Sequence, residues 1–325
     1  MERREQRWPK IAVVGAGAVG GYYGGMLARA GAPIVLIGRP AFADAVRKAG
    51  LVLDTTSFRE TVTVDVATEL AAVRGAELVL FCVKSGDTTS VARELAKLVD
   101  PGAVVLSMQN GVDNIDRIRA TPGLKALAVV VYVAASTPEP GTVKHVGGGN
   151  LVLGPPSAET EDIAAVFERA GVPCRLSDNI RGELWAKLVA NCGLNAISAL
   201  GRARYGQIKE NSDACTLVRE VVDEVFAVAR ASRVVMPGMA DAAAAYAATM
   251  AIADRMAGAR SSTAQDVERG RRTEIDALNG YVARQAAELG VPAPLNHALW
   301  ALVKLIEAAP PHPALSPEDG GEGKE

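Results

Sequence analysis

The chain has 325 residues, of which 49% are hydrophobic, and a formal net charge of −2. This length allows two domains, each with its own core. The near-neutral charge gives no field that favours nucleic acid or an acidic membrane surface, so we expect a small-molecule partner, with no nucleic acid and no membrane. The cysteines form no CxxC pair, which predicts reduced thiols in a cytoplasmic protein, without a metal site or a disulfide framework.

The two ends of the sequence are polar. The first eight residues, MERREQRW, are too charged for a signal peptide. The longest apolar run, residues 126–135, is too short to cross a bilayer. Residues 310–325 are rich in Pro, Gly and Glu, so we predict a disordered tail there.

A glycine-rich stretch near the start, KIAVVGAGAVGGYYGG, predicts a dinucleotide site. A buried strand over Ile11–Val14 leads into a GxGxxG turn and a helix over Ala18–Arg29. In such a turn the first glycine permits the bend, the second lets backbone N–H groups approach a pyrophosphate, and the third lets the helix pack on the strand. The N-terminus of the helix attracts the anion. The predicted cofactor-binding residues here are Gly15, Gly17, Ala18, Val19 and Gly20.

The end of the second predicted strand, Ile34–Ile37, indicates which dinucleotide binds. An NAD site usually has an acidic residue there for the ribose 2′-hydroxyl, whereas this chain has Gly38 and Arg39. We therefore predict that Arg39 binds the 2′-phosphate of NADP. The alternative is a solvated loop arginine.

Strands and helices alternate through the first half of the chain. This pattern predicts an α/β fold, a Rossmann-type doubly wound sheet that is mostly parallel and has helices on both faces. Residues 127–154 look like an edge hairpin that closes this domain. The further strands are expected at 62–66, 78–83, 103–107 and 172–176, and the helices at 88–98 and 159–170.

Two polar residues are expected at the carboxyl ends of neighbouring strands. Lys84 follows the strand at 78–83, and Asn110 follows the strand at 103–107. Ligands of such sheets bind at this edge, so both residues are predicted to lie near the nicotinamide half of the cofactor and the substrate. Taken singly, each residue could instead belong to a turn.

Strand patterns end near residue 178, so we divide the chain into 1–178, a nucleotide-binding domain, and 179–309, an all-helical domain. The helical domain opens with Ile180–Leu200. There Lys187, Asn191 and Asn195 recur every four residues and form one polar stripe beside apolar side chains. Further helices are expected at 215–231, 239–256, 272–289 and 298–308, and a polar segment is expected over 260–274.

With these motifs, the chain resembles the ketopantoate reductase (2-dehydropantoate 2-reductase) family from Ile11 to about Glu307. In the first half the resemblance lies in GAGAVGG, CVKSGDT and MQNGVDN. In the second half it lies in RGELWAKLVANCGLNAISAL and SSTAQDVERGRRTEIDALNGYV. It implies a dinucleotide-binding domain, a helical domain, and NADPH-dependent reduction of the 2-oxo acid ketopantoate to pantoate in pantothenate biosynthesis.

The resemblance also implies roles for individual residues. Lys187 would be the general acid and Glu274 its partner carboxylate, while Lys84 and Asn110 would lie where cofactor and substrate meet. One departure concerns substrate recognition, because Tyr205 stands where some members have a substrate-binding asparagine. The implied substrate contacts are Asn110, Lys187, Asn191, Asn195 and Ser262.

The chemistry of ketone reduction is consistent with these roles. Hydride transfer builds negative charge on the carbonyl oxygen, so a cationic donor such as Lys187 can stabilise that charge and supply the proton. Burial would lower the pKa of Lys187, and Glu274 would oppose that shift. Taken alone, Lys187 would more often be a surface lysine and Glu274 a solvated or capping carboxylate.

Two other functions stay open at this point. One is an NADP-dependent reductase of another branched 2-oxo acid, and the other is a sensor that binds NADP without turnover. The long helices of the second domain could pair between subunits, so we expect a homodimer.

Overall fold

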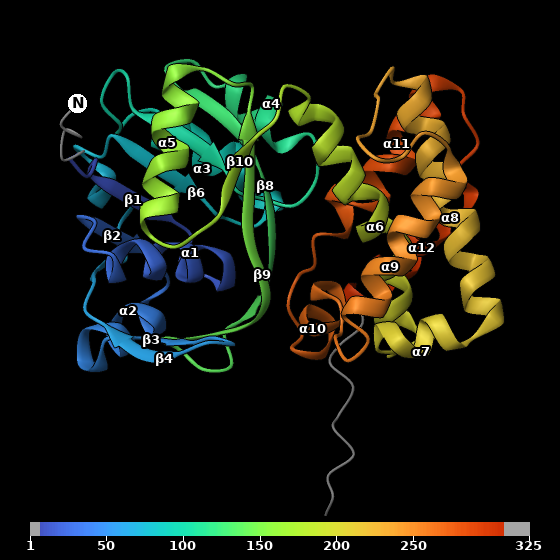
Figure 1. Cartoon of the computed structure of the whole chain (residues 1–325), viewed down its shortest axis with the longest axis horizontal. Helices are drawn as coiled ribbons and strands as arrows, with labels where there is room; N and C mark the ends of the chain where they lie inside the picture. Colours follow the sequence, from blue (N-terminus) through green and yellow to red (C-terminus); the bar gives the residue numbers. More distant parts are fainter. Residues whose placement is uncertain (1–6, 309–325) are drawn as a thin grey trace, which may run out of the picture.

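The computed structural model describes residues 7–308, and the tail predicted at 310–325 lies outside them. A sheet-containing domain and a helical domain lie side by side (Figure 1). The predicted fold class, a Rossmann-type sheet followed by helices, is therefore confirmed. The boundaries drawn at 1–178 and 179–309 stay predictions. None of the helices in the described part combines the length and hydropathy that a membrane span requires.

A single ten-stranded sheet forms the first domain, in the order β4-β3-β9-β8-β7-β6-β1-β2-β5, with β10 beside β9. All neighbouring strands are parallel except for the pairs β3–β4 and β8–β9. The strands are β1 (Ile11–Val14), β2 (Ile34–Ile37), β3 (Leu51–Asp54), β4 (Arg59–Val62), β5 (Asp65–Ala67), β6 (Leu78–Phe81), β7 (Val104–Ser107), β8 (Lys125–Ser136), β9 (Thr142–Gly154) and β10 (Cys174–Leu176).

Two of the strand predictions were wrong. The hairpin at 127–154 is not at the edge, because β8 pairs with β7 while β9 pairs with both β3 and β10. The strand predicted at 62–66 is two strands, since β4 ends at Val62 and β5 begins at Asp65. These two strands lie at opposite ends of the sheet, β4 beside β3 and β5 beside β2.

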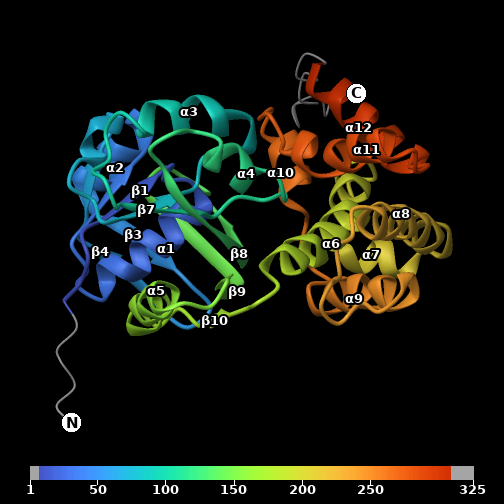
Figure 2. The same cartoon turned by 90° about the horizontal axis from the view of Figure 1, so that it is seen from above.

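Helices cover both faces of the sheet because the strand side chains alternate between the faces. On β1, Ile11 and Val13 face the core under α1 and α5, whereas Ala12 and Val14 face the core under α3 and α4. Figure 2 shows the two helix layers on either side of the strands. The helices are α1 (Ala18–Arg29), α2 (Pro40–Ala49), α3 (Thr88–Leu95), α4 (Asn114–Arg119) and α5 (Ala158–Arg169), with the 3-10 turns η1 (Leu70–Val73) and η2 (Ser85–Asp87).

The helical domain is built around α6, which also contacts β8 and β9 of the sheet. Its apolar side chains, including Leu184, Leu188 and Cys192, are buried against the surrounding helices. The elements are α6 (Ile180–Leu200), α7 (Tyr205–Glu210), α8 (Ser212–Ala231), α9 (Ala242–Arg255), α10 (Ser262–Glu268), η3 (Ile275–Ala277), α11 (Asn279–Leu289) and α12 (Pro294–Ala308).

The start of α11 differs from the sequence prediction, which placed it at residue 272. The chain instead runs through an irregular segment to Glu274 and the short turn η3, and α11 begins at Asn279. Glu274 is therefore a residue of the connecting segment rather than of a helix. This position carries its side chain towards the first domain, as the contacts below describe.

Candidate active site

The glycine turn after β1 is shaped by two close backbone approaches. Gly15 has a φ of +100°, and a Cβ there would lie 2.8 Å from the carbonyl carbon of Cys82. A Cβ on Gly20 would lie 2.3 Å from the carbonyl oxygen of Gly15. Both positions therefore need glycine, the first for its left-handed conformation and the second for the contact of α1 with the turn.

Gly17 differs from these two glycines because a Cβ there would meet no atom within 4 Å. Ala18 and Val19 begin α1, where the backbone N–H groups of the first turn have no partner within the helix. That turn contains no acidic residue. Open space, free donors and the helix dipole together fit the pyrophosphate of a dinucleotide.

Arg39 lies beside this turn at the end of β2, which is the parallel neighbour of β1. It precedes α2 as its N-cap residue, and its side chain is exposed. No other residue in the range 7–308 forms a hydrogen bond or ion pair with the guanidinium group. The side chain is therefore available to an anion from solution.

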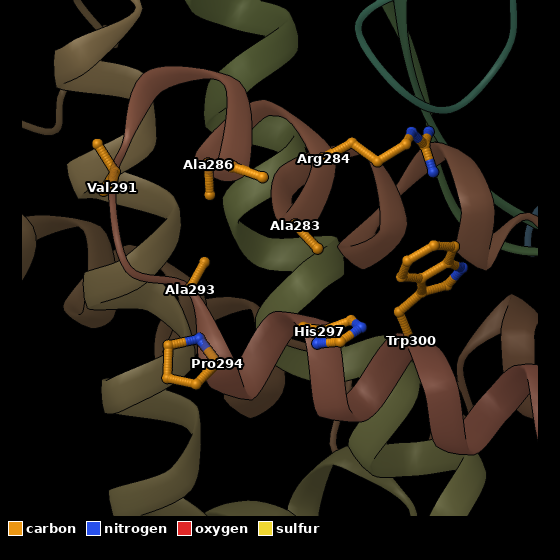
Figure 3. Close-up of a pocket in the computed structure, with 9 residues that line it drawn as sticks. Ala283, Arg284, Ala286, Val291, Ala293, Pro294, His297 and Trp300 are labelled. Carbon is orange, nitrogen blue, oxygen red and sulfur yellow. The ribbon is translucent and has the colours of Figure 1, made fainter.

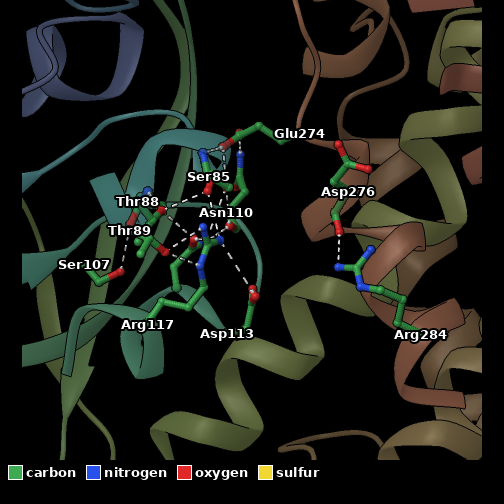
Figure 4. Close-up of polar contacts among 12 residues, drawn as sticks. Ser85, Thr88, Thr89, Ser107, Asn110, Asp113, Arg117, Glu274, Asp276 and Arg284 are labelled. Carbon is green, nitrogen blue, oxygen red and sulfur yellow. Dashed lines mark hydrogen bonds and ion pairs between the residues drawn. The ribbon is translucent and has the colours of Figure 1, made fainter. Parts of the chain in front are cut away.

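The loops after β6 and β7 form the next part of the same sheet edge, because Phe81 and Ser107 are register partners. The buried Oγ of Ser85 lies 3.2 Å from the backbone carbonyl oxygen of Asn110. The side chain of Asn114 donates to the same carbonyl, at 2.6 Å. Figure 4 shows this polar cluster. These contacts fix the backbone from which the Asn110 side chain projects.

Glu274 reaches this cluster from the helical domain. Its Oε1 accepts hydrogen bonds from the backbone N–H of Ser85, at 3.1 Å, and from the Ser85 hydroxyl, at 2.7 Å. Its Oε2 accepts from Nδ2 of Asn110, at 2.9 Å. The carboxylate is therefore held at both oxygens by the first domain.

Lys187 approaches the same asparagine from α6. Its Nζ donates to Oδ1 of Asn110, at 2.9 Å, and to the backbone carbonyl of Val131 on β8, at 2.5 Å. Burial of the ammonium lowers the pKa of Lys187 to about 8, although the nearby negative charge of Glu274 acts in the opposite direction. A lysine with this pKa can hold and release a proton close to neutral pH.

The Asn110 amide thus contacts both predicted catalytic side chains. Its oxygen accepts from Lys187, and its nitrogen donates to Glu274. The reversed amide would place a donor against the ammonium and an acceptor against the carboxylate, so these contacts favour a single orientation. The structure therefore brings Lys187, Glu274 and Asn110 together at the carboxyl edge of the sheet.

Lys84 is directed to a residue that sequence reasoning missed. Its Nζ lies 2.6 Å from Oδ2 of Asp266 on α10, and 46% of the Lys84 side chain is exposed. Burial raises the pKa of Asp266, and the charge of Lys84 partly offsets that effect. The pair forms a further contact between the two domains.

The rest of the polar stripe on α6 runs away from this cluster. Asn191 is partly buried, and Asn195 is buried between α7 and α10. The hydroxyl of Tyr205 donates to Oδ1 of Asn195, at 3.1 Å, and the hydroxyl of Ser261 donates to the Asn195 carbonyl, at 2.9 Å. Tyr205 is thus a direct neighbour of a predicted substrate contact.

Ser262, the predicted serine contact, is the exposed first residue of α10 and has no hydrogen bond to another described residue. The buried neighbour Ser261 is the N-cap of that helix and accepts from the backbone N–H of Ala264. Sequence reasoning missed Ser85, Ser261 and Asp266, although all three lie within the motifs CVKSGDT and SSTAQDV.

A separate pocket lies within the helical domain, between α11 and α12, with Arg284, His297 and Trp300 in its lining (Figure 3). None of the predicted site residues lines it. The candidate site is therefore defined by the convergent polar side chains at the domain boundary.

Comparison with known proteins identifies the family. The family model described as "Ketopantoate reductase PanE/ApbA" matches residues 11–158, and the model for its C-terminal part matches residues 179–307. A curated 2-dehydropantoate 2-reductase from Pyrococcus abyssi is 32% identical, over 92% of this chain and 98% of that protein.

Solved structures share the fold. A PanE/ApbA family ketopantoate reductase from Ralstonia eutropha JMP134 has a TM-score of 0.86 and 48% identity, over 91% of this chain and 98% of its own. A D-mandelate dehydrogenase, solved with NADH and anilino(oxo)acetate, has a TM-score of 0.84 at 23% identity, over 91% and 97% of the two chains. At that identity the likeness shows a common fold alone. The matched family models cover most of the sequence, and the chain therefore belongs to the ketopantoate reductase family.

Proposed function

We propose that the protein reduces 2-dehydropantoate (ketopantoate) to pantoate with NADPH. The observation that carries this proposal is the position of Lys187, whose Nζ is fixed by Asn110 and Val131 at the carboxyl edge of the parallel sheet. This edge is where ligands of such sheets bind. The names and identities of the curated relatives also support it.

The glycine turn would hold the pyrophosphate through the N–H groups of Ala18 and Val19, with Gly17 leaving space for its approach. Arg39 would bind the 2′-phosphate that distinguishes NADP from NAD. Lys84 and Asn110 would border the nicotinamide half. When bound, NADPH supplies the hydride that the reaction requires.

Lys187 would supply the proton. With a pKa of about 8, its ammonium form predominates at neutral pH. That cation stabilises the negative charge that develops on the carbonyl oxygen and then donates a proton from Nζ to it. Glu274 keeps the lysine charged, because its negative charge raises the pKa that burial lowers.

The remaining residues of the α6 stripe would bind the substrate. Asn191 and Asn195 carry donors suited to the oxygens of a 2-oxo acid, and Ser262 is exposed at the start of α10. A fold shared with D-mandelate dehydrogenase does not select among 2-oxo acids. Reduction of another branched 2-oxo acid is therefore the rival proposal, and NADP binding without turnover is the other.

One assay separates these functions. The purified protein is mixed with NADPH and either ketopantoate or one of a panel of 2-oxo acids, and the fall in NADPH absorbance is followed. We expect ketopantoate to have the highest kcat/KM. Oxidation only with other acids would overturn the ketopantoate assignment, and no oxidation with any acid would leave NADP binding as the function.

The homodimer stays a prediction, which light scattering of the purified protein would test.

A further inference from the structure

Tyr205 is the first residue of α7, and its aromatic ring is buried in the core of the helical domain, with 8% of the residue exposed. Backbone hydrogen bonds fix this residue, because its N–H donates to the carbonyl of Ala259 and the next N–H donates to Ala257. The only hydrogen bond of its hydroxyl within the described residues goes to Oδ1 of Asn195. The Tyr205 hydroxyl thus has Asn195 as its one described hydrogen-bond partner.

This bond sets the orientation of the Asn195 amide. If the amide were reversed, Nδ2 would donate to the tyrosine oxygen, and the tyrosine proton would lose its acceptor in a buried environment. Leaving a buried donor unpaired is costly, so the observed orientation is the favoured one. The backbone carbonyl of Asn195 is held separately by Ser261, at 2.9 Å.

The nitrogen of the same amide is left available. Nδ2 of Asn195 has no hydrogen-bond partner within residues 7–308, yet it does not belong to the enclosed unpaired atoms. It is therefore not fully enclosed by the surrounding protein. Tyr205 thus leaves the Asn195 amide with a hydrogen-bond donor that no other described residue uses.

The position of Asn195 determines which part of a substrate it can reach. It lies eight residues beyond Lys187 on α6, or about 12 Å along the helix axis. In ketopantoate the 2-oxo oxygen and the hydroxyl oxygen are about 4 Å apart, so with a hydrogen bond of about 3 Å at each end the acid spans about 10 Å. With the reacting carbonyl at Lys187, the Asn195 amide would face the opposite end of the substrate, which is the side chain of the acid.

We propose that Tyr205 is a specificity-determining positioning residue. Through Asn195 it presents a hydrogen-bond donor to a hydroxyl oxygen on the substrate side chain, and so favours hydroxylated 2-oxo acids over their hydrocarbon counterparts. This inference rests on the proposed 2-oxo acid reduction and adds the residue pair that selects the side chain.

Two substrates that differ by one group test this proposal: ketopantoate and 3,3-dimethyl-2-oxobutanoate, which lacks only the hydroxyl. In Tyr205→Phe, we expect kcat/KM for ketopantoate to fall about two- to tenfold, mainly through KM, which corresponds to one neutral hydrogen bond. The value for the other acid should stay unchanged. Tyr281→Phe is the matched control, because within residues 7–308 the Tyr281 hydroxyl bonds only to Gln285 on the same helix, α11. This variant should alter neither value.

A double-mutant cycle tests whether Tyr205 acts through Asn195. In an Asn195→Ala background, Tyr205→Phe should cause no further loss with ketopantoate. Equal losses with both substrates, no loss at all, or a loss that persists in that background would overturn the inference while leaving the proposed function intact. If the wild-type protein failed to oxidise NADPH with every 2-oxo acid tested, the proposed function would be refuted, and this inference with it.

Discussion

Asn110 links the two predicted catalytic residues, Lys187 and Glu274, through a single amide. The protonation of Lys187 depends on its burial and on the charge of Glu274. Burial lowers the pKa of the lysine, and Glu274 raises it, with a net value of about 8. The ordinary value is 10.5. Between these two pH values the folded chain binds fewer protons at Lys187 than the unfolded chain does, so the stability contributed by this group rises with pH there.

The same pKa predicts the pH dependence of the reaction. A general acid must be protonated, so kcat/KM for ketopantoate should fall about tenfold for each pH unit above pH 8. Lys187→Ala should reduce kcat by about 10² to 10⁴ and abolish this alkaline limb. Steady-state rates over about pH 6 to 10 measure both effects. Lys97→Ala, on the exposed surface of the first domain, serves as the control. A limb that persists in Lys187→Ala would assign the proton to another group.

Arg39 controls cofactor preference if it binds the 2′-phosphate. Arg39→Ala should lower the preference for NADPH over NADH by about tenfold to a hundredfold, the range for a charge-assisted hydrogen bond. The ratio of kcat/KM values with the two cofactors measures it. Arg47→Ala is a suitable control, because Arg47 lies on α2 and pairs with Asp44. An unchanged ratio in Arg39→Ala would refute the proposed role.

At the residue scale, sequence reasoning predicted roles for Lys187, Asn110 and Glu274, which the structure brings together, but it missed the residues that contact them. Ser85 and Glu274 are 189 positions apart, and Lys84 and Asp266 are 182 apart. No local pattern relates residues at such separations, because their contact depends on how the domains dock. Motif resemblance therefore predicted the chemistry, whereas the hydrogen bonds between the domains follow only from the three-dimensional structure.

At the scale of elements, two glycines in the turn between β1 and α1 are needed for different reasons, Gly17 for ligand access and Gly20 for packing. Gly17→Ala adds a methyl group to open space, so it should weaken NADPH binding while leaving the melting temperature of the free protein unchanged. Gly20→Ala forces a methyl group against the Gly15 carbonyl and should also destabilise the fold by about 1 to 3 kcal/mol. Calorimetric titration and thermal unfolding measure the two effects. Equal stability losses in both variants would contradict this division.

The elements predicted best were those with strong local patterns. The strand Ile11–Val14 and the helices Ala18–Arg29 and Ile180–Leu200 match their predicted bounds. The β3 strand was missed, and the long hairpin was placed at the wrong position in the sheet. Strand order depends on which distant strands pair, as β3 does with β9, and the sequence periodicity carries no such information.

At the scale of the whole molecule, the domains meet through contacts that differ in energetic value. The pair Lys84–Asp266 is half exposed on its lysine side, so Asp266→Asn should reduce the free energy of unfolding by only about 0.2 to 1 kcal/mol. Urea unfolding measures this change, with Asp254→Asn, which removes the surface pair with Lys209, as the control. A loss several times larger would show that the pair is a main contributor to domain docking.

The contacts of the Asn110 amide with Lys187 and Glu274 also affect whether domains can be exchanged between such proteins. The helical domain contributes Lys187 and Glu274, and the first domain contributes the amide and the Ser85 hydroxyl that orient them. If the proposed roles hold, a helical domain transplanted from a relative would bring its own substrate-binding side chains. It would acquire a positioned proton donor only on a host domain whose β6 and β7 loops carry that serine and asparagine. The orientation of Lys187 and Glu274 thus depends on two short loops of the first domain, together with the Val131 carbonyl on β8.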